Sequence, residues 1–218
     1  HYEGQIKVIN YGGTLSSVNK EDNNGIINVS KADSVILYIT AATSYELKDS
    51  VFLLPNAIKF KGNAHPHNQV TERIRKAVEK GYEYLRSEHI ADYQHFFNRV
   101  DLQLTEHTPS IPTDKLLNQY RNGKHNAYLE ELFFQYGRYL LISSSRQGSL
   151  PANLQGAWNQ YEFAPWSGGY WHNVNIQMNY WPAFNTNLAE LFIPYMNYNE
   201  TFRKAAVNKA VNYITQNN

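Results

Sequence analysis

The chain changes its hydrophobic period once, and this change constrains the fold more than any other feature of the sequence. Before about residue 60 the apolar residues come in short runs rich in β-branched side chains, whereas from about residue 69 they recur every three to four positions. The first pattern is typical of strands and the second of amphipathic helices. We therefore expect an α+β chain in which strands come first and helices dominate afterwards.

Three apolar runs in the first part predict strands, at residues 6–9, 25–29 and 34–40. A glycine turn at 11–13 follows the first strand, and a polar turn at 19–24 precedes the second. The third run is almost continuously apolar, which is typical of a strand covered on both faces. Three strands are few for a domain, so we expect partner strands upstream of His1.

Helical periodicity predicts helices over 69–99, 127–144, 175–183 and from about 187 to 215. Within the first segment a second apolar stripe begins near Ile90, and Ser87 is its expected N-cap. In the last helix Pro194 is expected either to bend the helix or to mark its true start.

Two segments between the predicted helices differ in kind. Residues 100–104 alternate and predict a short strand, and 105–124, with two prolines and a glycine, predict a linker. The segment 145–172 contains four glycines and two prolines and predicts a long loop. A loop of this length inside a compact domain is usually functional.

Charge and composition exclude several classes of function. The net charge is +1 and the basic residues are scattered, so a nucleic-acid partner is not expected. No apolar run has the length of a membrane span, so no membrane partner is expected. The chain has no cysteine, and the histidines at 65 and 67 lack carboxylate companions, so we expect no metal site.

The loop and the helix after it concentrate residues that suit a polar, ring-shaped ligand. All four tryptophans and five asparagines fall within 150–183. An indole stacks on the apolar face of a sugar ring, and amides both donate and accept hydrogen bonds to hydroxyl groups. The alternative is a buried amide network that fastens the loop to the helices, and composition alone does not separate the two.

Several stretches in this region carry a family resemblance. They are FQYGRYLLISSSR at 134–146, PANLQGAWN at 151–159, PW at 165–166 and NVNIQMNYWPA at 173–183. With them, residues 128–183 resemble the start of the catalytic domain of glycoside hydrolase family 95, the inverting 1,2-α-L-fucosidase family. Weaker similarity extends upstream to 41–45 and 91–100.

The resemblance implies a fold and a domain order. Residues 1–68 would be the end of an N-terminal β-sandwich, 69–125 a helical linker, and 126–218 the first helices of an (α/α) six-hairpin barrel. The chain then is an α+β fragment from the middle of a larger enzyme, and both of its ends look like cuts. We expect it to be inactive alone and to pair with the missing remainder or with a second copy. The family also suggests a secreted or periplasmic location.

The implied reaction is removal of terminal α-L-fucose, or a related L-sugar such as L-galactose, from an oligosaccharide with inversion and without a cofactor. Similarity to the family assigns the water-holding Asn-x-Asn pair to Asn173 and Asn175, with a polarising Asp and an acidic Glu beyond this chain. Because the resemblance places the acid beyond this chain, we do not nominate Glu162, Glu190 or Glu200 as the acid. Asn173 has a second interpretation as the N-cap of the following helix.

The aromatic residues around this pair are the expected substrate-binding residues: Trp158, Trp166, Tyr170, Trp171 and His172. Two positions depart from the family pattern, since Trp171 stands where the family usually has His and Phe184 where it has Glu. The indole at 171 could stack on the sugar or block it, and His172 could substitute. A non-catalytic sugar-binding fragment, an α-L-galactosidase and a purely structural helical domain remain alternatives.

Overall fold

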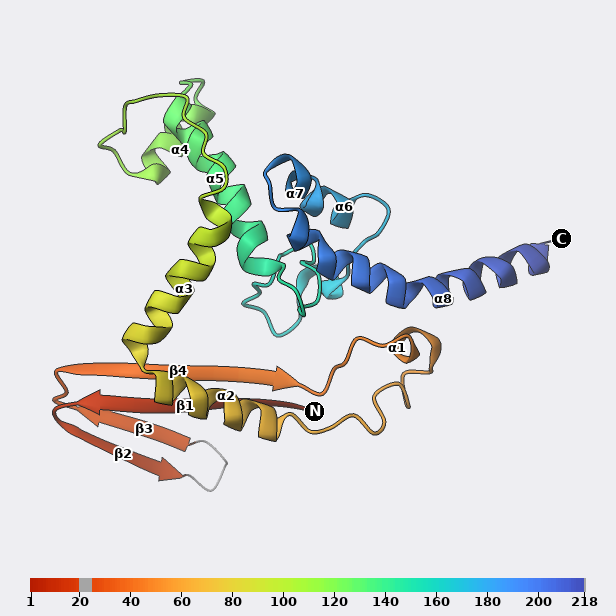
Figure 1. The fold of residues 1–218 in the computed structure, drawn as a ribbon, viewed down its shortest axis with the longest axis horizontal. Helices are drawn as coiled ribbons and strands as arrows, with labels where there is room; N and C mark the ends of the chain where they lie inside the picture. The colour runs from red at the N-terminus through yellow and green to blue at the C-terminus, as the bar shows by residue number, and fades with distance from the viewer. Residues whose placement is uncertain (20–24, 218) are drawn as a thin grey trace. The chain divides into compact units, whose positions relative to one another are not determined.

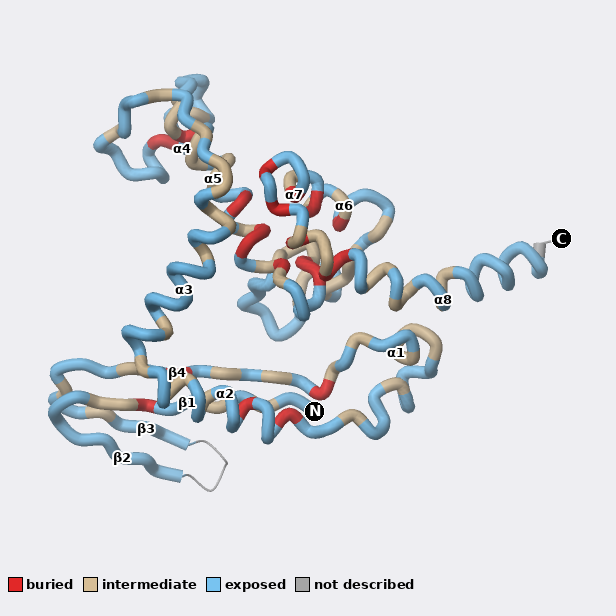
Figure 2. The backbone as a smooth tube through the Cα atoms, in the orientation of Figure 1, coloured by how far each residue is buried: buried red, intermediate tan, exposed pale blue. Residues whose placement is uncertain are grey.

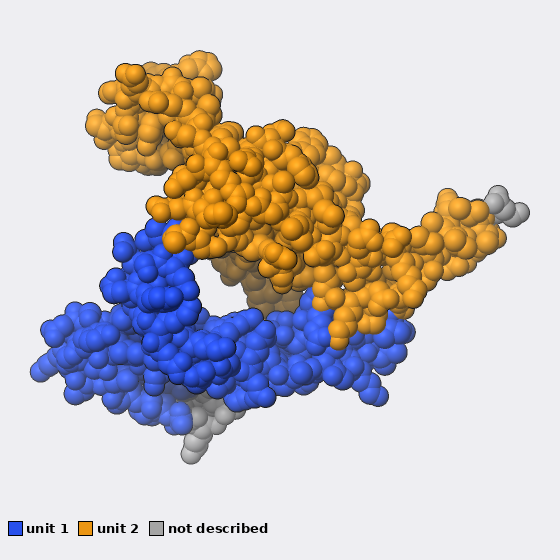
Figure 3. Space-filling model, viewed as in Figure 1, with its two compact units in different colours: residues 1–46, 54–90 blue, residues 47–53, 91–218 orange. Residues whose placement is uncertain are grey.

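The computed structural model describes residues 1–19 and 25–217, which form two compact units (Figures 1 and 3). The first unit comprises His1–Glu46 and Leu54–Ile90. The second comprises Leu47–Leu53 and the chain from Ala91 onward. The expected order of strands before helices is confirmed. The turn predicted at 19–24 lies outside the described residues, apart from Asn19.

The first unit contains two antiparallel strand pairs. Strand β1 (Tyr2–Tyr11) pairs with β4 (Ser34–Thr43), and β2 (Thr14–Asn19) pairs with β3 (Gly25–Ser30). The predicted glycine turn joins β1 to β2, where a Cβ on Gly13 would lie 2.2 Å from the Ser30 carbonyl oxygen. The sequence missed β2 because most of its residues are polar. The expected sandwich is not confirmed, since the described strands form two two-stranded sheets.

Helix α2 (His67–Lys80) packs on one face of the β1–β4 pair (Figure 1). Tyr38 on β4 and Val70 on α2 are buried, and so is Val8 on β1, which pairs with Leu37 and lies on the opposite face of the pair from Tyr38. The expectation that residues 34–40 are covered on both faces is wrong for this chain, because the alternate residues of β4 are exposed. Their exposed fractions are 42% for Val35, 58% for Leu37 and 69% for Ile39.

The helix predicted over 69–99 is interrupted. Helix α2 ends at Lys80 and is followed by Gly81, which has φ 75°, and α3 runs from Tyr82 to Phe97. Ser87, the expected N-cap, lies inside α3 and donates a hydrogen bond from its Oγ to the Tyr84 carbonyl at 2.8 Å. The left-handed glycine therefore sets the boundary, and the predicted cap is wrong. A short helix, α1 (Ser50–Leu53), follows the last strand and was not expected before residue 60.

The second unit is helical. Helix α5 (Ala127–Ser144) has the predicted bounds and is capped by Asn126, whose side chain accepts a hydrogen bond from the Leu129 amide at 2.9 Å. The helix expected over 175–183 is split into α6 (Asn175–Tyr180) and α7 (Pro182–Asn185). A 3₁₀ turn, η2 (Ala189–Phe192), precedes α8 (Ile193–Asn217), so Pro194 marks the start of that helix, as one of the two expectations had it.

Two predictions for residues 100–124 are wrong. No strand forms at 100–104; instead the amides of Leu104 and Thr105 donate to the Glu131 carboxylate on α5. The predicted linker contains α4 (Thr113–Arg121), which begins after Pro112 and buries Leu116. Hydrogen bonds to α5, which is distant in sequence, thus take the place of the strand pairing expected at 100–104.

The core of the second unit lies where the C-terminal half of α5 meets α6, α7 and the start of α8 (Figure 2). Arg138 is buried on α5 and closes the C-terminal end of α3, because its guanidinium donates to the carbonyls of Phe96, Phe97 and Val100. The opposite side of α5 is exposed, with Phe133 at 79%. Among the described residues, no helix has the length and apolar character needed to cross a membrane.

Candidate functional site

The start of the long loop is held by a buried cluster of hydrogen bonds. Ser145 Oγ donates to the Leu191 carbonyl at 2.8 Å and lies 2.7 Å from the Tyr180 hydroxyl. The Tyr180 hydroxyl accepts from the Ala152 amide at 2.9 Å. Because the serine proton goes to the carbonyl, Tyr180 must donate its own proton to Ser145. Burial raises the pKa of Tyr180, so the phenol stays a donor.

Further along, an amide network fastens the loop to α6. Asn179 Nδ2 donates to the Asn153 carbonyl at 2.8 Å, and Asn153 Oδ1 accepts from the Gln155 amide at 2.8 Å. Gln155 Nε2 reaches the Pro165 carbonyl at 3.2 Å. For these three side chains the structure favours the structural alternative raised by the sequence. They set the shape of the loop from which the tryptophans project.

Two tryptophans and one of the predicted catalytic asparagines meet at one open hollow, which we call the indole hollow. It has a volume of about 510 Å³ and is lined by Leu154, Trp166, Trp171, Asn175, Met178 and Asn179. A volume of this size is typical of small-ligand sites. Apolar ring faces and amide groups therefore share one surface.

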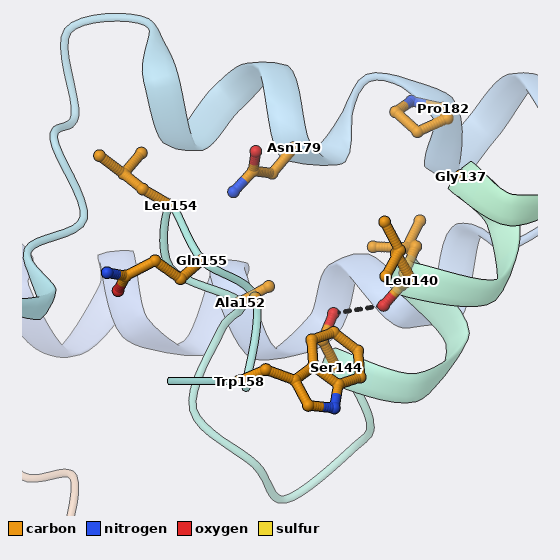
Figure 4. Close-up of a pocket in the computed structure, with 11 residues that line it drawn as sticks. Gly137, Leu140, Ser144, Ala152, Leu154, Gln155, Trp158, Asn179 and Pro182 are labelled. Carbon is orange, nitrogen blue, oxygen red and sulfur yellow. Dashed lines mark hydrogen bonds between the residues drawn. The ribbon is translucent and has the colours of Figure 1, made fainter. Parts of the chain in front are cut away.

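Trp158 lies at a different part of the loop. It borders a shallow hollow of about 350 Å³ that it shares with Trp166, Gln155 and Pro165. It also lines a groove of about 370 Å³ between α5 and the loop, where it lies beside Ser144 (Figure 4). Trp166 borders both the indole hollow and the hollow of Trp158, so the two spaces are neighbours.

The two predicted catalytic asparagines are both exposed. Asn175 is the first residue of α6 and lines the indole hollow, whereas Asn173 lies in the turn before it and does not. The N-cap of α6 is Val174, without a side-chain cap, so the interpretation of Asn173 as the N-cap is wrong. Within 1–19 and 25–217, no hydrogen bond engages either of these two amide side chains.

Tyr170 and His172 belong to an aromatic cluster on α8 instead of the indole hollow. His172 Nε2 lies 3.1 Å from Asn199 Oδ1, and the imidazole stacks on Tyr198 with centroids 5.5 Å apart. The Tyr170 ring lies 4.6 Å from the same Tyr198 ring. In this structure His172 therefore does not take the place that Trp171 occupies at the hollow.

None of the three carboxylates that we declined to nominate lines a hollow described above. Glu190 pairs with Arg99 at 2.6 Å, and Glu200 pairs with Arg203 at 3.0 Å on the surface of α8. Glu162 is exposed. Burial acts to raise the pKa of Glu190, but hydrogen bonds from its own backbone amide and from Arg99 outweigh it, so the net pKa is lowered. In the described part of the chain, no group of His, Asp and Glu is arranged to hold a metal.

The sequence did not predict the backbone that carries the tryptophans. Trp166 and Ser167, in the 3₁₀ turn η1 (Pro165–Gly168), and then Trp171 have φ of 52°, 57° and 53°. Side chains other than glycine rarely adopt this left-handed conformation. The only local signal in the sequence is the glycine pair 168–169, which marks a tight turn without identifying its strained neighbours.

Comparisons with known proteins agree with the resemblance. Residues 81–218 match the model of the glycosyl hydrolase family 95 catalytic domain. The chain is 42% identical over 166 residues to a probable alpha-fucosidase A of Aspergillus niger and 35% identical over 200 residues to alpha-L-fucosidase 2 of Arabidopsis thaliana. These alignments cover 75% and 89% of this chain but 20% and 22% of the two relatives. The chain thus spans about a fifth of their length.

Proposed function

The chain belongs to glycoside hydrolase family 95, and from this premise we propose that it is part of an enzyme that hydrolyses α-L-fucosides. The proposed reaction removes terminal α-L-fucose, or a close relative such as L-galactose, from an oligosaccharide with inversion. Two of the similar proteins are named as fucosidases. The indole hollow is the proposed place of the sugar.

The observation that carries the proposal is the meeting of Trp166, Trp171 and Asn175 at one hollow. The indoles offer apolar faces for the ring of the sugar. The Asn175 amide has no hydrogen-bond partner within the described residues, so its donors and its acceptor remain available to a ligand or a water. A purely structural loop would be expected to satisfy this amide internally, as it does that of Asn179.

In the proposed mechanism Asn173 and Asn175 hold the attacking water. Inverting hydrolysis needs a base-activated water on one face of the sugar and an acid at the leaving oxygen on the other. An amide oxygen is a weak base unless a carboxylate polarises it through hydrogen bonds. No described carboxylate lines the indole hollow. The proposal therefore assigns the acid and the polarising carboxylate to other parts of the intact protein.

The other predicted substrate-binding residues are proposed to have either a direct or an indirect role. Trp158, in the neighbouring hollow, is proposed to contact the rest of the oligosaccharide. Tyr170 and His172 are proposed to act indirectly, because the cluster they form on α8 supports the turn that carries Trp171.

A second candidate function is sugar binding without hydrolysis, since the indoles and amide groups that line the hollow are sufficient for binding alone. Titration of the intact protein with fucose, followed by tryptophan fluorescence, tests the site. An assay for fucose release from a 2-fucosylated oligosaccharide tests the chemistry. We expect a response in both. Binding without release would identify a binding module, and no fluorescence response would refute the sugar site.

A further inference from the structure

We infer that Gly169 is a positioning residue, which lets the Trp171 indole lie against the backbone and face the indole hollow. The inference rests on the proposed function, because it concerns the same sugar site. It adds a residue that does not line the hollow and has no functional group of its own.

The first step is the path of the chain from Trp166 to Trp171. Trp166, Ser167 and Gly168 are left-handed in succession, and the Gly169 amide donates to the Trp166 carbonyl at 3.0 Å. This tight turn brings two indoles five residues apart to one hollow. Left-handed residues other than glycine cost about 1–2 kcal/mol each. Strain of this kind persists mostly where function needs it.

The second step is the contact between Gly169 and Trp171. A Cβ added to Gly169 would lie 3.1 Å from Trp171 Nε1 and 3.4 Å from Trp171 Cδ1. It would also lie 3.3 Å from the Trp166 carbonyl oxygen. The indole therefore occupies the space that any other side chain at 169 would need. Even alanine must push the ring aside by a few tenths of an ångström.

The third step separates this effect from backbone strain. Gly169 has φ −71° and ψ 156°, an extended conformation open to every residue. A glycine here is not needed for the backbone angles, so what requires it is the close approach of the Trp171 indole and the Trp166 carbonyl oxygen, of which the indole is the nearer. Gly156 provides a parallel, since its Cβ would lie 2.8 Å from Trp158 Cζ3. Gly156 has φ 70°, however, so a substitution there would mix both effects.

The test uses Gly169→Ala and Gly169→Val in the intact protein. Both residues accept the observed backbone angles, and the larger one should displace the indole further. We expect KM for a 2-fucosylated oligosaccharide to rise about twofold for alanine and about tenfold for valine, the range that aromatic stacking contributes. We expect kcat to stay close to the wild-type value, since uniform binding is lost. Gly4→Ala, where the new Cβ would be 3.7 Å from its nearest neighbour, is the control.

A double-mutant cycle with Trp171→Ala decides the mechanism. If Gly169 acts through the indole, Gly169→Val should have no further effect on KM in the Trp171→Ala protein. An effect that persists there, or a double variant that fails to fold, would overturn the inference and point to the Trp166 carbonyl. A single variant that misfolds while the double variant folds would support it. If Trp171→Ala itself leaves KM unchanged, the proposed sugar site fails.

Discussion

The two ends of the long loop are held in opposite ways. At its start, Ser145 and Tyr180 are almost fully buried, and their hydroxyls are bonded to each other and to backbone groups. At its far end, Trp166 and Trp171 are 62% and 50% exposed on a left-handed backbone. The contrast indicates that the residues that anchor the loop to the core are different from the residues that the loop exposes to a ligand.

This separation has a physical basis. A buried hydroxyl contributes to stability only when its hydrogen bonds are satisfied inside the protein. A ligand-binding side chain must instead leave its polar atoms or ring faces open, and so it adds little to stability. We therefore expect substitutions at one end of the loop to change stability and those at the other end to change binding or turnover.

The largest effect should follow from Asn175→Ala in the intact protein. If Asn175 helps to hold the water, turnover should fall by about a hundredfold to ten-thousandfold, as on losing a general base. The melting temperature should stay near the wild-type value, since the side chain is exposed and makes no hydrogen bond to a described residue. Asn208→Ala, an exposed asparagine on α8, is the matched control. Near-normal turnover in the Asn175 variant would exclude it from the base machinery.

The next effect should appear in stability alone. Tyr180→Phe leaves the Ala152 amide without its acceptor in the buried core, which costs about 1–3 kcal/mol. Chemical denaturation of the intact protein measures this change, and KM should not change. Tyr136→Phe, on the exposed side of α5, should alter stability by less than about 0.5 kcal/mol. An unchanged midpoint for the Tyr180 variant would mean that the buried cluster of hydrogen bonds does not hold the loop.

The elements predicted correctly were those whose signals are local. Helix α5 follows from the apolar period of its own residues, and the Asn126 cap that the structure adds lies next to the helix start. The predicted strand at 100–104 failed because its surroundings are set by distant residues. Arg138 donates to the carbonyl of Val100 across 38 positions of sequence, and Glu131 accepts from the amide of Leu104 across 27 positions. No periodicity within the segment reports such contacts.

The candidate site was predictable in location but not in orientation. Composition singled out the loop, and Trp166, Trp171 and Asn175 do meet. The neighbours Tyr170 and His172 pack on α8 instead. Their direction follows from the left-handed backbone of Trp171, a conformation that sequence preferences for tryptophan would not suggest.

A smaller effect should come from Trp166→Ala, and it should fall on binding. Trp166 borders the indole hollow, so losing its ring should weaken fucose binding about threefold to tenfold. Trp181→Ala is a close control, because Trp181 is also 62% exposed and is absent from the described lining of each hollow. Fluorescence titration should show weakened binding only for the Trp166 variant. Equal affinities for the two variants would remove Trp166 from the site.

The smallest effect should come from Glu190→Gln. This variant tests whether Glu190, the neighbour of Leu191 in the buried cluster, contributes only to stability. The pKa of Glu190 is lowered in the folded chain, because the hydrogen bonds from its own backbone amide and from Arg99 outweigh the effect of burial. A lowered folded pKa means that the carboxylate stabilises the fold above its unfolded pKa, about 4.3, and loses this contribution as the pH falls through the folded value.

The Glu190 side chain is 41% exposed, so solvent screening limits the contribution to less than about 1 kcal/mol. Denaturation midpoints of the wild type and the variant should therefore differ slightly at pH 7 and converge as the pH falls below the lowered pKa of Glu190 in the folded chain. Turnover should be unchanged, since Glu190 does not line the indole hollow. A variant with a normal midpoint but no turnover would instead identify Glu190 as the acid, and the division between the two ends of the loop would no longer hold.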